Sequence, residues 1–155
     1  MALATDIEVL RGLEIFSSFT REQLRLLAFG CQRLSFPAGT ELYHSNQSAD
    51  GAYVILSGKV ELTIELNQTR HKMEIFAAGS ILGELSMITR NRRVGTALAI
   101  EAVDLMKIRR DTMYRVIDEF PDLAAVLYDH IADSVIKMGP ELDRVMMVLP
   151  PDSQN

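Results

Sequence analysis

The sequence predicts an α+β fold in which short strands, forming a sandwich or a closed roll, lie between helical segments. Three observations predict it: helical signals in residues 1–30, a succession of short apolar runs in residues 31–109, and helical signals again in residues 110–149. Many short strands separated by turns at near-regular spacing are typical of sandwiches and rolls. At 155 residues the chain fits one domain with a core of its own, ending in a polar tail over residues 150–155.

The N-terminal helical segment is predicted from a capping box and an apolar repeat. Thr20 and Gln23 have the spacing at which each side chain can satisfy the other's free backbone N–H. Leu24 and Leu27 follow at helical spacing, and Gly30 is the expected stop. A helix is therefore expected just before the first strand.

The central strands are predicted from apolar runs bounded by turn residues. They are expected over residues 32–36, 40–44, 52–56, 59–66, 72–76, 96–100 and 103–108. In residues 59–66, apolar and polar side chains alternate, which predicts one buried and one exposed face. Residues 37–39 and 67–69 are expected to form turns.

Two helices are predicted in the C-terminal section. Asp111 is expected to cap the first, over residues 112–119, and Pro121 suits the first position of the second, which should run to about Met138. The Gly139-Pro140 pair must break or redirect that helix. The second helix carries an apolar stripe at Ala124, Leu127, Ile131, Val135 and Met138. The stripe can pack on the strands or pair with its copy in a homodimer, and we favour the homodimer because so apolar a helix must be covered.

The composition predicts a cytoplasmic globular protein. Hydrophobic residues make up 48% and charged residues 24% of the chain, and its formal net charge is −5, which argues against broad nucleic-acid affinity. No run approaches the length that spans a membrane, and no signal peptide is recognisable. The single cysteine, Cys31, excludes an internal disulfide framework and is expected to be a buried thiol.

The most informative segment is residues 79–97. Gly83 and Glu84 stand at the start of a short apolar segment, and a basic cluster of Arg90, Arg92 and Arg93 follows. A helix N-terminus facing a guanidinium can hold one phosphate, and a nearby carboxylate can accept a hydrogen bond from a sugar hydroxyl. This combination suggests a cyclic nucleotide as ligand. Taken singly, Glu84 could complement a helix dipole and Arg93 could be a solvated loop residue.

The chain resembles the cyclic-nucleotide-binding domain of the bacterial catabolite activator, protein kinase regulatory subunits and cyclic-nucleotide-gated channels. The resemblance extends from about Phe16 to Met138. It depends on the order and spacing of residues 36–40 (FPAGT), 53–60 (YVILSGKV) and 78–86 (AGSILGELS), with Arg93 nine positions after Glu84. It implies an antiparallel, jelly-roll-like β-roll with an N-terminal helical segment and C-terminal helices.

The resemblance also implies roles for individual residues. Glu84 would accept a hydrogen bond from the ribose 2′-hydroxyl, and Arg93 would bind the exocyclic phosphate oxygens. Gly83, Leu85 and Ser86 would offer backbone N–H groups to the ligand at the first turn of the short helix that is expected to begin there. The ligand implied is cyclic AMP, with cyclic GMP as the alternative, and no metal is involved.

Three positions depart from the usual family pattern. Val94 follows Arg93, where members that favour cyclic GMP often carry threonine, and this favours cyclic AMP. Asn46 stands where many members have glycine, and asparagine tolerates the same left-handed backbone. The break at Gly139-Pro140 implies an apolar lid, with Met138 or residues around Val145 as candidates.

The leading hypothesis is a non-catalytic sensor that moves its C-terminal helices and signals to an unidentified protein partner or a second subunit. The alternative is the ligand-sensing part of a catabolite-activator-type transcriptional regulator without its DNA-binding domain. An enzyme on a related roll, such as a metal-binding cupin, would need clustered histidines, and His44, His71 and His130 lack that spacing. The remaining hypothesis is a degenerate domain that serves only as an interaction scaffold.

Overall fold

The N-terminal segment is helical, as predicted, in the computed structural model, which describes residues 2–133. Two α-helices, α1 (Ala2–Arg11) and α2 (Arg21–Phe29), are joined by a short 3₁₀ helix, η1 (Glu14–Phe16). The predicted capping box is present: the Thr20 N–H donates to Gln23 Oε1 at 2.8 Å, and the Gln23 N–H donates to Thr20 Oγ1 at 3.2 Å. Helix α2 ends at Gly30, as expected.

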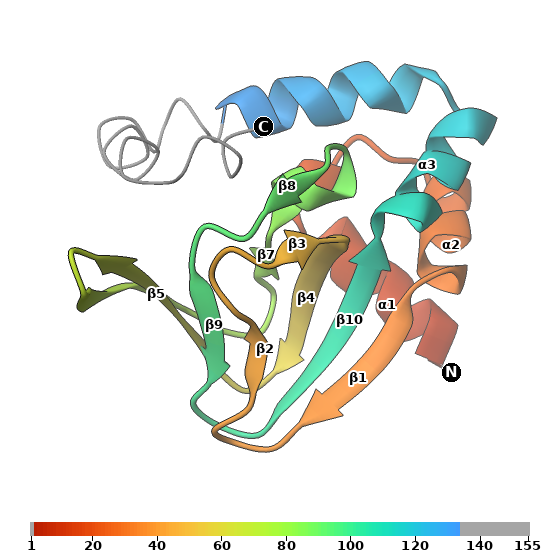
Figure 1. Ribbon diagram of the computed structural model, residues 1–155. Coiled ribbons are helices and arrows are strands. Elements are labelled where there is room, and N and C mark those ends of the chain that lie inside the picture. Colours follow the sequence, from red (N-terminus) through yellow and green to blue (C-terminus); the bar gives the residue numbers. More distant parts are fainter. Residues whose placement is uncertain (1, 134–155) are drawn as a thin grey trace.

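Antiparallel sheets form the β-roll in the described part of the chain, which confirms the predicted fold class (Figure 1). One sheet has the strand order β1-β10-β4-β7, a second has the order β2-β9-β5-β6, and β3 pairs with β8. The strands are β1 (Gln32–Phe36), β2 (Glu41–Tyr43), β3 (Ser48–Ala49), β4 (Gly51–Ser57), β5 (Val60–Leu66), β6 (Thr69–Phe76), β7 (Ile81–Leu82), β8 (Asn91–Arg92), β9 (Thr96–Ala99) and β10 (Val103–Arg109). Strands β3, β7 and β8 were not predicted, because two residues are too few to show a period.

The hairpin of β5 and β6 extends away from the rest of the roll (Figure 1). Asn67 and Gln68 form its tip with φ angles of 52° and 66°, both left-handed. The predicted alternation of β5 is wrong at Thr63, which is buried next to Ile64 where an exposed polar side chain was expected. Beyond it, Ile64 is buried and Glu65 is exposed, as predicted. The pairing of β5 with β6 shifts register between Leu62 and Thr63.

Strand β10 runs directly into helix α3 (Arg110–Glu119), and residues 122–133 form a further helix that lies across one end of the roll (Figure 1). The predicted Asp111 cap is wrong. Arg109 is the N-cap with extended backbone angles, and Asp111 lies in the first turn, 3.5 Å from the Arg109 guanidinium.

The apolar stripe of the last helix packs inside this chain where the structure describes it. Leu127 and Ile131 are buried in the core beneath the N-terminal helices, which is the first of the two readings left open above. Val135, Met138, the Gly139-Pro140 break and the tail at 150–155 lie outside the described residues. A homodimer through residues 124–138 therefore stays a prediction. Within residues 2–133 no helix has the length and apolar character needed to cross a bilayer.

Two hydrophobic cores lie on opposite faces of the sheet that contains β4 and β10. The helix-side core joins the helices to one face and includes Phe16, Val54 and Met106. The roll-side core fills the space between the sheets and includes Tyr53 and Ile55. Alternate residues of β4 point to opposite faces of this sheet, one toward each core. Strand β7 pairs with β4 at the edge of the same sheet, so the segment that follows β7 lies at the boundary between the two cores.

Candidate functional site

The predicted ligand cradle is a left-handed turn at Gly83 followed by a short 3₁₀ helix, η2 (Glu84–Met87). We call residues 83–89 the cassette. Gly83 has φ = 75°, and a Cβ there would lie 2.4 Å from Arg93 Nη1, so only glycine fits without displacing the arginine. The expected helix N-terminus is thus a four-residue 3₁₀ turn. Its Ser86 N–H donates to the Gly83 carbonyl at 3.0 Å, so that donor is used within the turn.

Arg93 lies on the roll side of the cassette and is only 5% exposed. Its Nη2 donates to the Gly51 carbonyl at 2.7 Å, and its Nη1 lies 3.4 Å from Ser86 Oγ. The guanidinium also lies over two aromatic rings, 4.3 Å from the centre of Tyr43 and 5.6 Å from that of Tyr53. Such contacts favour a cation, but none of them neutralises its charge.

No ion pair within residues 2–133 involves Arg93. Asp50 contributes a favourable charge from farther away but pairs with Lys107 at 3.0 Å and with Arg109 at 3.4 Å. Burial lowers the pKa of the Arg93 guanidinium, in spite of the opposing effect of the two tyrosines. Removing a charge from water without an opposite charge nearby is costly, so a buried cation in this position would gain free energy from an added anion.

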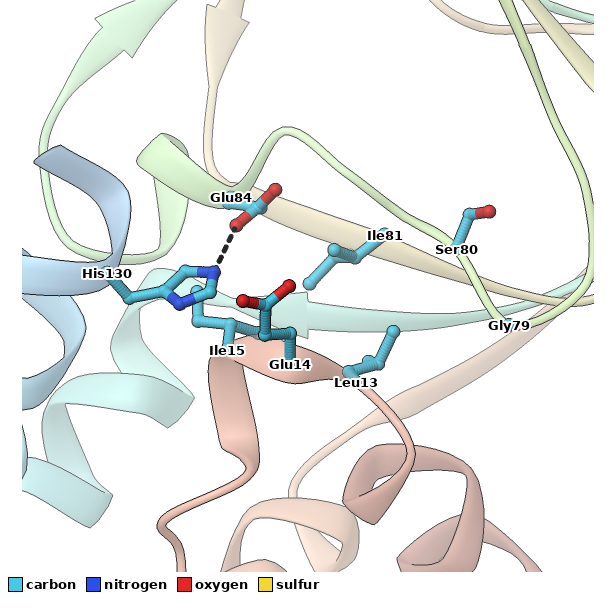
Figure 2. A pocket seen from close by; sticks show the side chains of 8 residues that line it. All are labelled: Leu13, Glu14, Ile15, Gly79, Ser80, Ile81, Glu84 and His130. Atoms are coloured by element: carbon cyan, nitrogen blue, oxygen red, sulfur yellow. Dashed lines mark ion pairs between the residues drawn. The ribbon is translucent and has the colours of Figure 1, made fainter. Parts of the chain in front are cut away.

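Glu84 lies on the helix side of the cassette, away from Arg93. Figure 2 shows its carboxylate directed toward His130 and facing Glu14 across a cavity of about 240 Å³. Glu84 Oε2 lies 3.8 Å from His130 Nε2. The same oxygen is buried and accepts no hydrogen bond within the described chain. Burial raises the pKa of Glu84, with a lowering contribution from His130 and a raising one from Glu14.

The structure therefore brings some of the predicted site residues together and separates others. Gly83, Ser86 and Arg93 are in contact, whereas Glu84 points to the opposite side. Leu85 is 38% exposed, and Ser86 is buried and donates to Asn91 Oδ1 at 2.8 Å. Val94 is half-buried, and its carbonyl accepts from Ser45 Oγ at 3.3 Å. The predicted lid residue, Met138, lies outside the described residues.

The loop before β3 fixes the backbone of Arg93. Asn46 adopts φ = 72°, the left-handed conformation that asparagine was expected to tolerate there. Its N–H donates to the Arg93 carbonyl at 2.8 Å, and the Arg93 N–H donates to the Gln47 carbonyl at 2.8 Å. Arg93 is thus held by its backbone as well as by its side chain.

Side chains of the C-terminal helices hold the cassette from the helix side. Arg110 Nη1 donates to the carbonyls of Ala49, Ser86 and Thr89 at 3.0, 3.2 and 3.1 Å. The Tyr114 hydroxyl donates to the Ile88 carbonyl at 2.6 Å. A displacement of the cassette would therefore be transmitted directly to α3.

A family model described as the cyclic nucleotide-binding domain matches residues 33–120, more than half of the chain. The chain belongs to this family. A solved cyclic nucleotide-binding-like protein from Brucella abortus is 39% identical, with a TM-score of 0.67 over 74% of this chain and 98% of that one. The regulatory domain of Toxoplasma gondii PKA, solved with cAMP, shares the fold at 16% identity and a TM-score of 0.76, over 88% of this chain and 50% of that one.

A curated relative is the cyclic AMP receptor protein of Thermus thermophilus, 23% identical over 134 residues, or 83% of this chain. The match spans 62% of that protein's length, so the relative contains sequence with no counterpart here. Membership of the family agrees with the resemblance in the 36–40, 53–60 and 78–86 segments.

Several residues around the cassette were missed by reasoning from the sequence. Tyr43 and Tyr53 appear in the sequence only as apolar strand residues, and nothing in their spacing places them over Arg93. Glu14 and His130 are 116 positions apart and meet only because the helices of both ends cover the same face of the sheet. Only the three-dimensional fold could reveal these contacts.

Proposed function

We propose that the chain is a non-catalytic cyclic-nucleotide sensor that binds cyclic AMP, and cyclic GMP less well, on the roll side of the cassette. The observation that carries this proposal is Arg93, a buried cation with no ion-pair partner in residues 2–133. A cyclic phosphate offers a single negative charge on two exocyclic oxygens, which a planar guanidinium can bind with two parallel hydrogen bonds.

The proposed ribose contact needs a movement of Glu84. Its carboxylate now faces His130, so it would have to turn to the roll side to accept a hydrogen bond from the 2′-hydroxyl. The unsatisfied Oε2 favours such a turn, because a buried carboxylate oxygen gains most from a new donor. Gly83, Leu85 and Ser86 would then offer backbone N–H groups to the phosphate, once the Ser86 N–H leaves the Gly83 carbonyl.

The preference for cyclic AMP is supported by the residue that follows Arg93. Val94 offers no hydroxyl to a guanine amino group. The neighbouring hydroxyls each make one hydrogen bond within the roll: Ser45 Oγ donates to the Val94 carbonyl, and Thr96 Oγ1 accepts from the Ser45 N–H at 3.1 Å. Adenine does not need such a hydroxyl in order to bind.

We propose that the signal leaves through the C-terminal helices. Arg110 and Tyr114 connect the cassette to α3, so two arrangements of the cassette imply two arrangements of these helices. The receiver would be a protein partner or a second copy of the chain. Since Leu127 and Ile131 are buried, a homodimer through residues 124–138 would have to use exposed side chains such as Tyr128. No direct nucleic-acid or membrane contact is part of the proposal, and the location expected from the sequence is the cytoplasm.

A second candidate is the ligand-sensing part of a transcriptional regulator of the catabolite-activator type. The match to 62% of the Thermus thermophilus cyclic AMP receptor protein supports it. In that case the sensor described here would keep its role, and a DNA-binding domain would receive the signal.

Calorimetric titration of the full chain with cyclic AMP and cyclic GMP tests the proposal. We expect binding of both, tighter for cyclic AMP, and a loss of about hundredfold to thousandfold in Arg93→Ala, because about two charge-assisted bonds are removed. Arg90→Ala, at an exposed position in the same basic cluster, is the matched control and should bind nearly as wild type does. Unchanged affinity in Arg93→Ala would exclude the roll-side phosphate site.

A further inference from the structure

Three elements that are distant in sequence converge on Glu84. Glu84 comes from the cassette, Glu14 from η1 and His130 from the helix at 122–133, and together they line one cavity (Figure 2). The side chains of Glu84 and His130 are 28% and 23% exposed, so water screens their contact only partly. The helix that carries His130 also contributes the buried Leu127 and Ile131 to the helix-side core.

The position of Glu84 toward His130 excludes its use on the roll side. The Glu84 carboxylate projects into the helix-side cavity, whereas Arg93 lies against the roll-side tyrosines. One side chain cannot point to both faces of the cassette at once. Any ligand that needs Glu84 on the roll side must therefore break the contact with His130.

We propose that His130 is a latch that holds Glu84 on the helix side and so opposes nucleotide binding, in a manner that strengthens as His130 becomes protonated. This inference rests on the proposed function, because it assumes that the nucleotide recruits Glu84. It gives His130 a positioning role in ligand affinity. It also gives the helix at 122–133 a direct means of sensing the nucleotide, because binding removes one of its contacts with the cassette.

The latch has a definite pH dependence. Histidine is the side chain that most often changes charge near neutral pH, and only the imidazolium attracts Glu84 as an ion pair. A lower pH, which favours the imidazolium, should therefore weaken nucleotide binding. Among residues 2–133, the other titratable group that lines this cavity is Glu14, whose carboxylate repels that of Glu84 and so acts against the latch.

Two substitutions of opposite effect test the latch. His130→Gln keeps a polar side chain without charge, and should bind cyclic AMP about threefold to tenfold more tightly than wild type at about pH 6, with little difference at about pH 8. His130→Lys keeps the charge at both pH values, so its affinity at about pH 8 should be lower than that of wild type. His71→Gln, on the exposed strand β6, is the control and should follow wild type at both pH values.

Calorimetry of the full-length variants at the two pH values separates the possible failures. If wild type binds cyclic AMP and His130→Gln binds it equally well or more weakly at both pH values, the latch is overturned. The proposed function then stays intact. Wild type that binds no cyclic nucleotide overturns both. Amide exchange gives a second readout: without nucleotide, residues 122–133 should exchange faster in His130→Gln than in wild type, and equal rates would also count against the latch.

Discussion

The two sides of the cassette carry opposite charges, and each charge is incompletely compensated within the described chain. On the roll side, Arg93 is a buried cation that is stacked on tyrosines and has no ion-pair partner in the described chain. On the helix side, Glu84 has a buried oxygen that accepts no hydrogen bond in residues 2–133 and a histidine at 3.8 Å. Within residues 2–133, Arg93 thus has no anionic partner and Glu84 Oε2 has no hydrogen-bond donor, although Glu84 belongs to the cassette and Arg93 contacts it.

The difference lies in how firmly each side is fixed. Arg93 is bound by its backbone to Asn46 and Gln47 and by its side chain to Gly51, which fixes one geometry. Within the described residues, the ion-pair contact of Glu84 is a long one, and its strength depends on the charge of His130. We infer that the roll side is preorganised for a phosphate and that the helix side is the adjustable half.

Replacing Arg93 with methionine should have the largest effect, and in opposite directions on binding and stability. The apolar side chain keeps most of the volume and removes the uncompensated charge. Affinity for cyclic AMP should fall by at least about hundredfold, whereas the free energy of unfolding of the ligand-free protein should stay unchanged or rise by up to about 2 kcal/mol. Calorimetry and urea unfolding measure the two quantities.

Arg90→Met is the matched control, since this arginine is exposed and belongs to the same basic cluster. It should change neither quantity appreciably. A large loss of stability in Arg93→Met would mean that the guanidinium is adequately compensated by Gly51 and the tyrosines, and the contrast between the two sides would disappear.

The turn that joins the two sides can be tested with a pair of glycines. Gly39 and Gly83 both have positive φ, at 91° and 75°, but a Cβ meets nothing within 4 Å at Gly39 and lies 2.4 Å from Arg93 Nη1 at Gly83. Gly39→Ala should cost about 1 kcal/mol of unfolding free energy through backbone strain alone. Gly83→Ala should cost about 2–3 kcal/mol, because it also displaces the buried guanidinium.

Nucleotide affinity should fall in Gly83→Ala and stay at the wild-type value in Gly39→Ala. Calorimetry and thermal unfolding of both variants give the comparison. Equal effects of the two substitutions would show that Arg93 moves aside freely, against the rigid roll side inferred here.

The contrast also shows what a sequence can predict. Capping residues, turn residues and strand alternation act over a few positions, so the helices and the main strands could be predicted. Thr63 was misplaced at the point where the pairing of β5 with β6 shifts register, because the extra residue lies in β6 and the alternation within β5 does not report it. Asp111 was misplaced because β10 runs straight into α3.

The site was predictable to the same extent. The motif identifies Gly83, Glu84 and Arg93, but the direction in which the Glu84 side chain points depends on Glu14 and His130, which reach it through tertiary packing. Spacing in the motif cannot encode that choice. The two-sided arrangement is therefore a property of the fold, and the residues that set it lie outside the motif.

The smallest expected effect is a pH-dependent gain of stability in Glu84→Gln. Because the folded protein binds the Glu84 proton more tightly than the unfolded chain does, wild type loses stability as the pH rises from the ordinary Glu pKa of 4.5 to the raised pKa of Glu84. The glutamine variant has no such loss. Its stability relative to wild type should be constant below that interval, increase through it by about 1 kcal/mol or less, and level off above it.

Urea unfolding at a series of pH values measures this difference, with Glu65→Gln at an exposed position of β5 as the control. The control should show no such rise, because water already solvates that carboxylate. A difference that shrinks as the pH rises would mean that the contact with His130 outweighs the burial of Glu84. The helix side would then be as firmly held as the roll side, and binding would have to displace a stable ion pair rather than relieve an unsatisfied carboxylate.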